Sequence, residues 1–169
     1  TFGQIGTQSF NGNKILTTGG GGMILSDNRT GARAKHLTTT AKIPHAWNFG
    51  HDAVAWNFRM PNLNAALGVA QLEQLPKFLS AKRKIADTYK IALADVIEVQ
   101  QEPAGCQSNF WLNAVICDDQ AMRDAILETT NEAGVMTRPI WTLMSHLPMF
   151  SDCDKGPLGV SEWLSARVV

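Results

Sequence analysis

The first part of the chain contains two short apolar runs and then a helical pattern. Residues 2–10 alternate weakly between apolar and polar side chains, and residues 23–25 form a second apolar run. Short runs bounded by glycine and polar residues are typical of strands. Asp27 or Asn28 follows the second run and can cap a helix that reaches Leu37. We therefore expect two strands and then a helix.

Residues 38–60 show no clear hydrophobic period. They carry three aromatic side chains among polar ones, Trp47, Phe49 and Trp56. A loop of this length inside a compact domain is usually functional or packed against a partner.

A helical period begins at Asn62. Apolar residues then recur at spacings of three and four, at Ala65, Val69, Leu72, Leu75 and Leu79. Pro76 lies within this pattern, and a proline inside a helix removes a hydrogen bond and clashes with the preceding turn. We expect a kink or break near Leu75, and then a second amphipathic helix to about residue 93.

The last part of the chain favours a strand, a helix and a strand. Residues 110–117 are almost continuously apolar, and Asp118 or Asp119 then caps a helix that ends at Gly134. The residues expected to face inward on that helix are Met122, Ala125, Ile126 and Ala133. A further strand is expected from Val135 and Met136. This order predicts a β-α-β unit and a fold of the α/β or α+β class.

Composition and charge exclude several classes of protein. Fifteen basic residues balance fifteen acidic ones, which gives no electrostatic case for nucleic acid or an anionic membrane surface. No apolar run approaches the ~20 residues that span a bilayer. The three cysteines lack a C-x-x-C spacing, which favours a reducing cytoplasm over a disulfide framework. The chain begins at Thr1, so we expect either a removed start or a piece of something longer.

The most informative local feature is Lys14, which precedes the four glycines 19–22. A lysine near a glycine-rich turn is usually a solvated hairpin residue. A phosphate-binding loop needs the opposite order, with glycines before the lysine. A third possibility is a lysine that forms a Schiff base with an aldehyde cofactor such as pyridoxal phosphate. Ser9 could then hold the cofactor phosphate, and the glycines would allow close approach of the backbone.

Three separated segments carry a resemblance to a known family. They read SFNGNKILTTGGGG at residues 9–22, WNFRMPNLNAALGVAQLEQL at residues 56–75 and TRPIWTLMSHLPMF at residues 137–150. Together they resemble the DegT/DnrJ/EryC1/StrS family of pyridoxal phosphate-dependent sugar aminotransferases, and within it the LegC-like subgroup. Many relatives read Gly-Glu-Gly-Gly where this chain has four glycines.

The resemblance implies roles for individual residues. Lys14 matches the Schiff-base lysine, which also moves a proton during the reaction, and members with histidine there are dehydratases. Ser9 matches the donor to the cofactor phosphate. Asn57, with Arg59 close by, matches a residue that reaches the phosphate from a neighbouring subunit. The positions matching the sugar-nucleotide segment are Arg138, Trp141 and His146.

The resemblance also implies an architecture. Residues 1–75 would be the remnant of a large domain of the aspartate-aminotransferase-like fold (fold type I), and residues 76–169 a small C-terminal α/β domain. Family members are roughly twice this long. The expected absence of the first half would leave this chain inactive alone, because that half supplies the carboxylate that faces the pyridine nitrogen.

The implied substrates are a nucleotide-linked 4-keto-6-deoxy sugar and an amino donor, glutamate by family habit. The implied setting is cytoplasmic synthesis of surface polysaccharide or nonulosonic acid. The implied assembly is a homodimer or higher homo-oligomer, with residues 38–60 at the interface. The alternative is a non-catalytic α/β module that self-assembles or binds a partner. His45 and His51 could form a metal pair, but no third ligand has suitable spacing, so no metal is expected.

Overall fold

The structure is a computed structural model that describes residues 3–169, and Phe2, the first residue of the first expected strand, lies outside them. The chain divides into two units, Thr1–Ser80 and Ala81–Val169. The boundary falls inside a helix, five residues beyond the division expected from the sequence. The assignment of the two parts as a large-domain remnant and a small domain stays a prediction.

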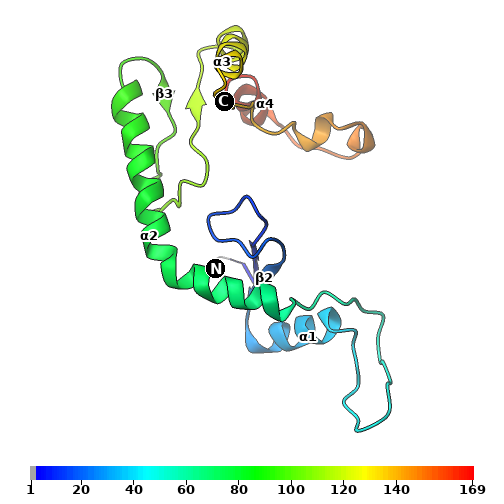
Figure 1. The fold of residues 1–169 in the computed structure, drawn as a ribbon. Helices are drawn as coiled ribbons and strands as arrows, with labels where there is room; N and C mark the ends of the chain where they lie inside the picture. Colours follow the sequence, from blue (N-terminus) through cyan, green and yellow to red (C-terminus); the bar gives the residue numbers. More distant parts are fainter. Residues whose placement is uncertain (1–2) are drawn as a thin grey trace. The chain divides into compact units, whose positions relative to one another are not determined.

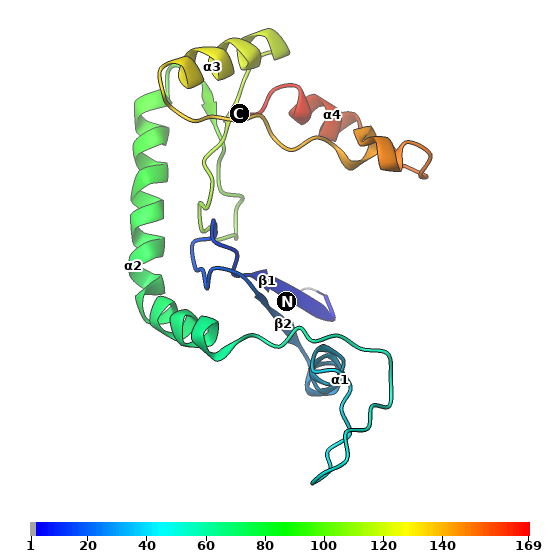
Figure 2. The ribbon, with the colours of Figure 1, turned by 45° about the vertical axis from the view of Figure 1, so that its right-hand side comes forward.

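The first unit begins with an antiparallel hairpin and a helix (Figures 1 and 2). Strand β1 (Ile5–Ser9) pairs with β2 (Gly22–Ser26), so that Ser9 lies opposite Gly22. Helix α1 (Asn28–Thr38) follows directly, and the Asp27 side chain caps it by accepting from the Thr30 N–H at 2.7 Å. This hydrogen bond lowers the pKa of Asp27. The predicted strand, strand and helix are confirmed.

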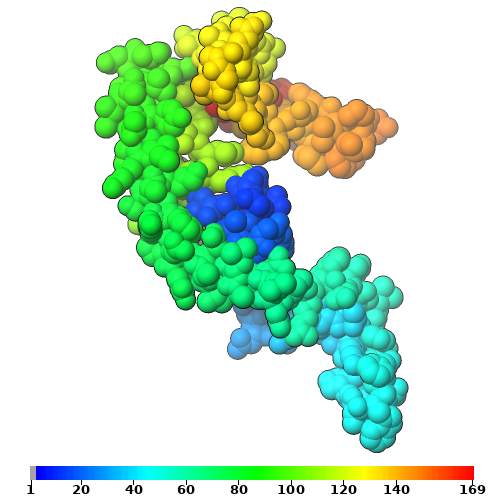
Figure 3. Space-filling model, viewed as in Figure 1, coloured from blue at the N-terminus to red at the C-terminus, as the bar shows by residue number. Residues whose placement is uncertain are grey.

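Residues 39–60 form an irregular excursion that we call the aromatic arm. Its two limbs meet at isolated bridges, Thr39 with Asn57 and Lys42 with His51. Figure 3 shows the arm in cyan and teal, and its large side chains are exposed, Trp47 by 80% and Phe49 by 74%. The absence of a period in the sequence is therefore matched by the absence of regular structure.

Helix α2 (Asn62–Leu93) passes through Pro76 without interruption. Of the two outcomes expected near Leu75, a kink or a break, the break does not occur, and Figures 1 and 2 show the helix bending in this region instead. Its predicted apolar face is only partly covered: Leu75 and Leu79 are half-buried, whereas Val69 and Leu72 remain 58% and 50% exposed.

The second unit contains a small sheet and short helices. Strand β3 (Glu98–Val99) pairs antiparallel with β4 (Val115–Ile116), and Ile116 also bridges Val168. Helix α3 (Gln120–Glu132) is capped by Asp119, whose side chain accepts from the Met122 N–H at 2.8 Å, and Gly134 follows it at φ 77°. The remaining elements are the 3-10 helices η1 (Met144–His146) and η2 (Pro148–Phe150) and helix α4 (Gly159–Ser165).

The expected β-α-β unit does not form. Of residues 110–117 only Val115 and Ile116 are in a strand, and Val135 and Met136 are irregular. Phe110 explains the shortened strand, because it adopts φ 44° and buries its ring, 6% exposed, against helix α2. The expectation that Ala125 and Ala133 face inward is also wrong, since both are exposed.

Phe110 is held in the second unit by two cations of α2. The Arg83 guanidinium lies 5.5 Å and the Lys90 ammonium 4.7 Å from the centre of its ring. Arg83 also donates to Glu102 at 2.9 Å and to the carbonyl of Ser108 at 2.9 Å. These contacts tie residues 102–110 to the helix and keep them out of the sheet. Among residues 3–169, no helix combines the length and apolar character that crossing a membrane requires.

Candidate cofactor site around Lys14

Lys14 lies in the connection between β1 and β2, residues 10–21, which we call the lysine loop. Main-chain bonds close its base: the Phe10 N–H donates to the Gly21 carbonyl at 2.9 Å, and the Thr18 N–H donates to the Phe10 carbonyl at 3.0 Å. The Thr17 hydroxyl donates to the same carbonyl at 3.1 Å. The loop thus has a fixed base formed largely by its own backbone.

Ser9 and Lys14 are linked through one residue at the start of this loop. The Asn11 N–H donates to the Ser9 hydroxyl at 3.4 Å, and the Asn11 carbonyl accepts from the Lys14 N–H at 3.0 Å. Ser9 is exposed and Lys14 is half-buried. The structure therefore brings together the two residues with the most specific predicted roles.

The glycine run serves the loop in two ways. Gly19 and Gly21 adopt φ 79° and 97°, a region that side chains other than glycine rarely occupy. A Cβ at Gly19 or Gly20 would meet nothing within 4 Å, so one side of the loop is open. The opposite holds at Gly22, where a Cβ would lie 2.6 Å from the Gln8 carbonyl oxygen. Sequence reasoning anticipated the open side but not the crowded one.

Thr18 connects the lysine loop to helix α2 and was missed by sequence reasoning. It is only 1% exposed, its hydroxyl donates to the Gly20 carbonyl, and its own carbonyl accepts from the Asn64 side-chain amide at 2.6 Å. A Cβ at Gly68 would lie 3.0 Å from the Thr18 methyl group. Figure 3 shows the blue loop lying against the green helix. The one available signal was Gly68, since a glycine inside a helix often marks close packing.

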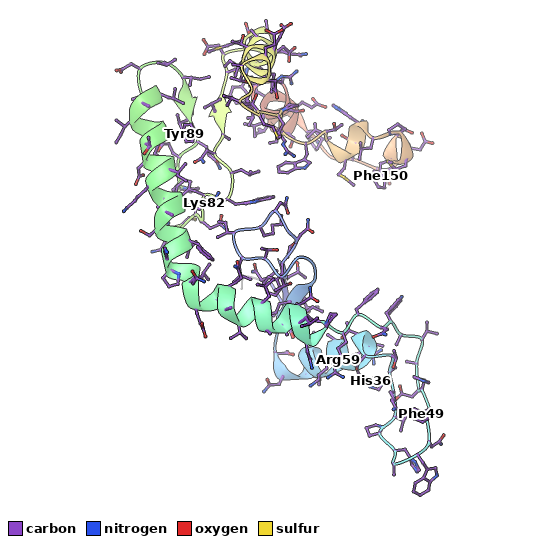
Figure 4. The ribbon with its side chains drawn as sticks, in the orientation of Figure 1. His36, Phe49, Arg59, Lys82, Tyr89 and Phe150 are labelled. Carbon is purple, nitrogen blue, oxygen red and sulfur yellow. The ribbon has the colours of Figure 1, made fainter. Side chains whose placement is uncertain are left out.

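Asn57 and Arg59 lie outside the lysine loop. Both are exposed on the returning limb of the aromatic arm, where Asn57 pairs with Thr39. Figure 4 shows Arg59 where this limb leads into helix α2. Their predicted role toward the cofactor phosphate stays a prediction.

Arg138, Trp141 and His146 belong to the second unit, and all three are exposed. Trp141 stacks on Trp111 with ring centres 6.3 Å apart and planes inclined by 28°. His146 ends η1, and its N–H donates to the Leu143 carbonyl at 2.8 Å. Their predicted contacts with the sugar nucleotide stay predictions.

The histidines of the first unit support the aromatic arm. His45 Nδ1 accepts from the Asn48 N–H at 3.0 Å, and His51 Nδ1 lies 2.7 Å from the Thr40 carbonyl. His36 Nε2 lies 2.6 Å from Asp52 Oδ1, and this hydrogen bond lowers the pKa of Asp52. Within residues 3–169, no three His, Cys, Asp or Glu side chains are grouped in a way that could hold a metal ion.

The groups around Lys14 fit the cofactor that the resemblance implies. Pyridoxal phosphate needs a primary amine for its aldehyde, a hydroxyl for its phosphate and room for a flat ring. Lys14 supplies the amine, Ser9 an exposed hydroxyl, and Gly19 and Gly20 an unobstructed side of the loop. The donor set therefore matches the chemistry of a phosphorylated aldehyde.

The chain is similar to known proteins over part of their length. The chain is 35% identical over 153 residues to GDP-perosamine synthase of Escherichia coli O157:H7, an alignment that covers 90% of this chain and 42% of the relative. The chain thus spans less than half the length of this relative.

Similar solved structures confirm the predicted α/β fold. The aminotransferase TlmJ from Streptoalloteichus hindustanus superposes with a TM-score of 0.90 at 28% identity, over 99% of this chain and 46% of that one. The E. coli GDP-4-keto-6-deoxy-D-mannose-3-dehydratase with bound hydrated PLP superposes with a TM-score of 0.82 at 23% identity, over 99% and 49%. The model of one family matches residues 1–169. The chain belongs to the DegT/DnrJ/EryC1/StrS aminotransferase family, whose cofactor is pyridoxal phosphate.

Proposed function

We propose that this chain carries the cofactor-bonding lysine of a pyridoxal phosphate-dependent aminotransferase that acts on a nucleotide-linked 4-keto-6-deoxy sugar, with glutamate as the amino donor. The observation that carries the proposal is the lysine loop, in which Asn11 links the Ser9 hydroxyl to the backbone of Lys14. The similar GDP-perosamine synthase, and a GDP-4-keto-6-deoxy-D-mannose 3-dehydratase that is 30% identical to this chain over 162 residues, support the substrate class.

Each predicted residue has a defined task in this proposal. The bound cofactor supplies an aldehyde that bonds amines and a ring that accepts an electron pair. The Lys14 amine holds the cofactor and, once released, moves a proton on the substrate, which requires the neutral amine. Ser9 and Asn57 bind the phosphate, and this fixes the ring so that one substrate bond is aligned. Arg59 assists at the phosphate, while Arg138, Trp141 and His146 contact the sugar nucleotide.

We further propose that the working unit is a homodimer, or a higher homo-oligomer, in which the aromatic arm carries Asn57 toward the neighbouring subunit. Support comes from the exposure of the arm, whose residues Trp47 and Val54 are 80% and 87% exposed. Residues 1–169 alone would then lack transaminase activity, because the carboxylate that faces the pyridine nitrogen would have to come from outside them. The proposed setting is the cytoplasm.

The test is covalent trapping. The protein encoded by the reading frame that contains residues 1–169 is incubated with pyridoxal phosphate, reduced with borohydride, digested and analysed by mass spectrometry. We expect the added mass on the peptide that contains Lys14, its loss in Lys14→Ala, and its retention in a Lys42→Ala control. A label on another peptide, or no label, contradicts the proposal and favours the non-catalytic module.

The substrate class is tested separately. Nitrogen-15 glutamate is supplied with GDP-linked or dTDP-linked 4-keto-6-deoxy sugars, and the products are analysed by mass spectrometry. Nitrogen-15 in the sugar product supports the proposed substrate class. If the cofactor is trapped on Lys14 but no sugar product contains nitrogen-15, the substrate class is contradicted and only the proposed cofactor bond stands.

A further inference from the structure

We propose that Asn64 and Gly68 of helix α2 are positioning residues for Lys14, acting through Thr18. The inference rests on the proposed function, because it concerns how the lysine is presented to the cofactor. Asn64 and Gly68 are both uncharged, so neither acts on the loop through an ion pair. Both act on the part of the lysine loop that lies four residues after Lys14.

The contact is specific to one main-chain group of the loop. The Asn64 side-chain amide donates to the Thr18 carbonyl at 2.6 Å, across 46 positions of sequence. Asn64 is half-buried and Thr18 is 1% exposed, so water does not readily replace this donor. A buried carbonyl that loses its partner is destabilised by its desolvation. The bond therefore favours one position of the loop against the helix.

Gly68 lies one helical turn after Asn64 and permits the close approach. A Cβ at this position would lie 3.0 Å from the Thr18 methyl group, closer than an ordinary van der Waals contact. An alanine would push the threonine away from the helix and lengthen the Asn64 hydrogen bond. Asn64 and Gly68 thus both position Thr18: Asn64 holds it by a hydrogen bond, and Gly68 leaves room for its side chain.

Thr18 transmits this placement to Lys14 through the base of the loop. The Thr18 N–H donates to the Phe10 carbonyl at 3.0 Å, and its hydroxyl donates to the Gly20 carbonyl. Phe10 directly precedes Asn11, whose carbonyl accepts from the Lys14 N–H at 3.0 Å. A displacement of Thr18 therefore moves the turn that carries the lysine. A misplacement of about 1 Å is enough to slow a bond-forming step greatly.

The experiment compares Asn64→Ala and Gly68→Ala with Asn62→Ala in the protein used for covalent trapping. Asn62 is the exposed first residue of the same helix and serves as the matched control. Two quantities are measured: the rate of borohydride trapping at Lys14 and the hydrogen exchange of the amides in residues 10–21. Asn64→Gln, which keeps the amide donor, serves as the rescue variant.

We expect trapping to slow by about fivefold to tenfold in Asn64→Ala, the effect of losing one ordinary hydrogen bond. Exchange in the lysine loop should rise in parallel, Asn62→Ala should match the wild type, and Asn64→Gln should recover part of the rate. Gly68→Ala should behave like Asn64→Ala; if it does not fold, Asn64→Ala still decides the question.

The failures are distinguishable. No label in the wild-type protein overturns the proposed function and this inference with it. A wild-type label with unchanged trapping in Asn64→Ala overturns the inference alone. Faster exchange without slower trapping also overturns it, because Asn64 would then stabilise the loop without positioning the lysine.

Discussion

At the scale of single residues, a methyl group added at Gly22 would lie 2.6 Å from the Gln8 carbonyl oxygen, whereas one added at Gly20 would meet nothing within 4 Å. The crowding at Gly22 arises because it faces Ser9 across the hairpin. Gly20 instead borders the open side of the lysine loop. Glycine is therefore needed at position 22 for strand pairing, whereas at position 20 it leaves free space beside the loop.

Three substitutions at Gly22 and Gly20 separate these requirements. We expect Gly22→Ala to destabilise the protein by about 1–3 kcal/mol, the usual penalty for inserting a methyl group into a packed position. Gly20→Ala is the matched control and should leave the free energy of unfolding nearly unchanged. Gly20→Glu, which restores the pattern of many relatives, should also fold. Urea unfolding followed by tryptophan fluorescence measures all three, and equal stabilities would contradict the reading of Gly22.

The candidate site was predictable from sequence only where its signals were local. Ser9 and Lys14 lie five positions apart, and their spacing with the glycines 19–22 pointed to them directly. Thr18 and Asn64 are 46 positions apart, and no spacing in the sequence connects them. Their contact depends on how the hairpin packs against helix α2, which no local pattern encodes.

At the scale of elements, the caps were the most reliable signals. Asp27 and Asp119 begin helices α1 and α3 as expected, because an aspartate at this position satisfies N–H groups that the helix leaves free. The strand expected over residues 110–117 failed because Arg83 and Lys90 draw the Phe110 ring to α2. The apolar sequence correctly predicted that Phe110 is buried, but it did not predict that helix α2, and not a neighbouring strand, covers it.

The link between Arg83 and Glu102 predicts a pH dependence. The hydrogen bond from Arg83, with a further one from the Ser108 N–H, lowers the pKa of Glu102 in the folded protein. Its contribution to stability is therefore present above the pKa of an unfolded glutamate, about 4.3, and is lost as the pH falls through the lower folded value. Glu102→Gln should lower the melting temperature near pH 7.

The difference between Glu102→Gln and the wild type should shrink as the pH falls below about 4, because the wild-type carboxylate then becomes protonated. Differential scanning fluorimetry from pH 7 to pH 3 measures this convergence. Glu73→Gln, an exposed position on helix α2, is the control and should show no such convergence. A constant gap across the range would show that the charge of Glu102 does not matter.

At the scale of the whole molecule, the amount of exposed surface is the outstanding property. Each of the two units, taken by itself, leaves large apolar side chains in contact with solvent. Apolar side chains contribute to this surface in both units, for example Leu63 at 87% and Val160 at 76%. Surface of this kind marks sites of association with other polypeptide.

The proposed homodimer gives this surface a measurable consequence. We expect sedimentation velocity to detect a concentration-dependent dimer or larger species, and the double variant Trp47→Ala with Phe49→Ala to weaken it by at least tenfold, since buried aromatic side chains dominate interface energies. Val160→Ala, an exposed apolar position of the second unit, is the control. A species that is monomeric at every concentration would contradict the proposal.

The way the lysine loop is closed has a consequence for its future variation. Its base is fastened by Phe10, Thr18 and Gly21, and the turn is held at position 14 through a main-chain N–H that donates to the Asn11 carbonyl, a group that every amino acid except proline offers. The chemical identity of that position can therefore change while the scaffold around it persists. Replacing the lysine by a histidine would exchange an amine for an imidazole on an unchanged backbone, so that a different reaction could arise without a change of fold.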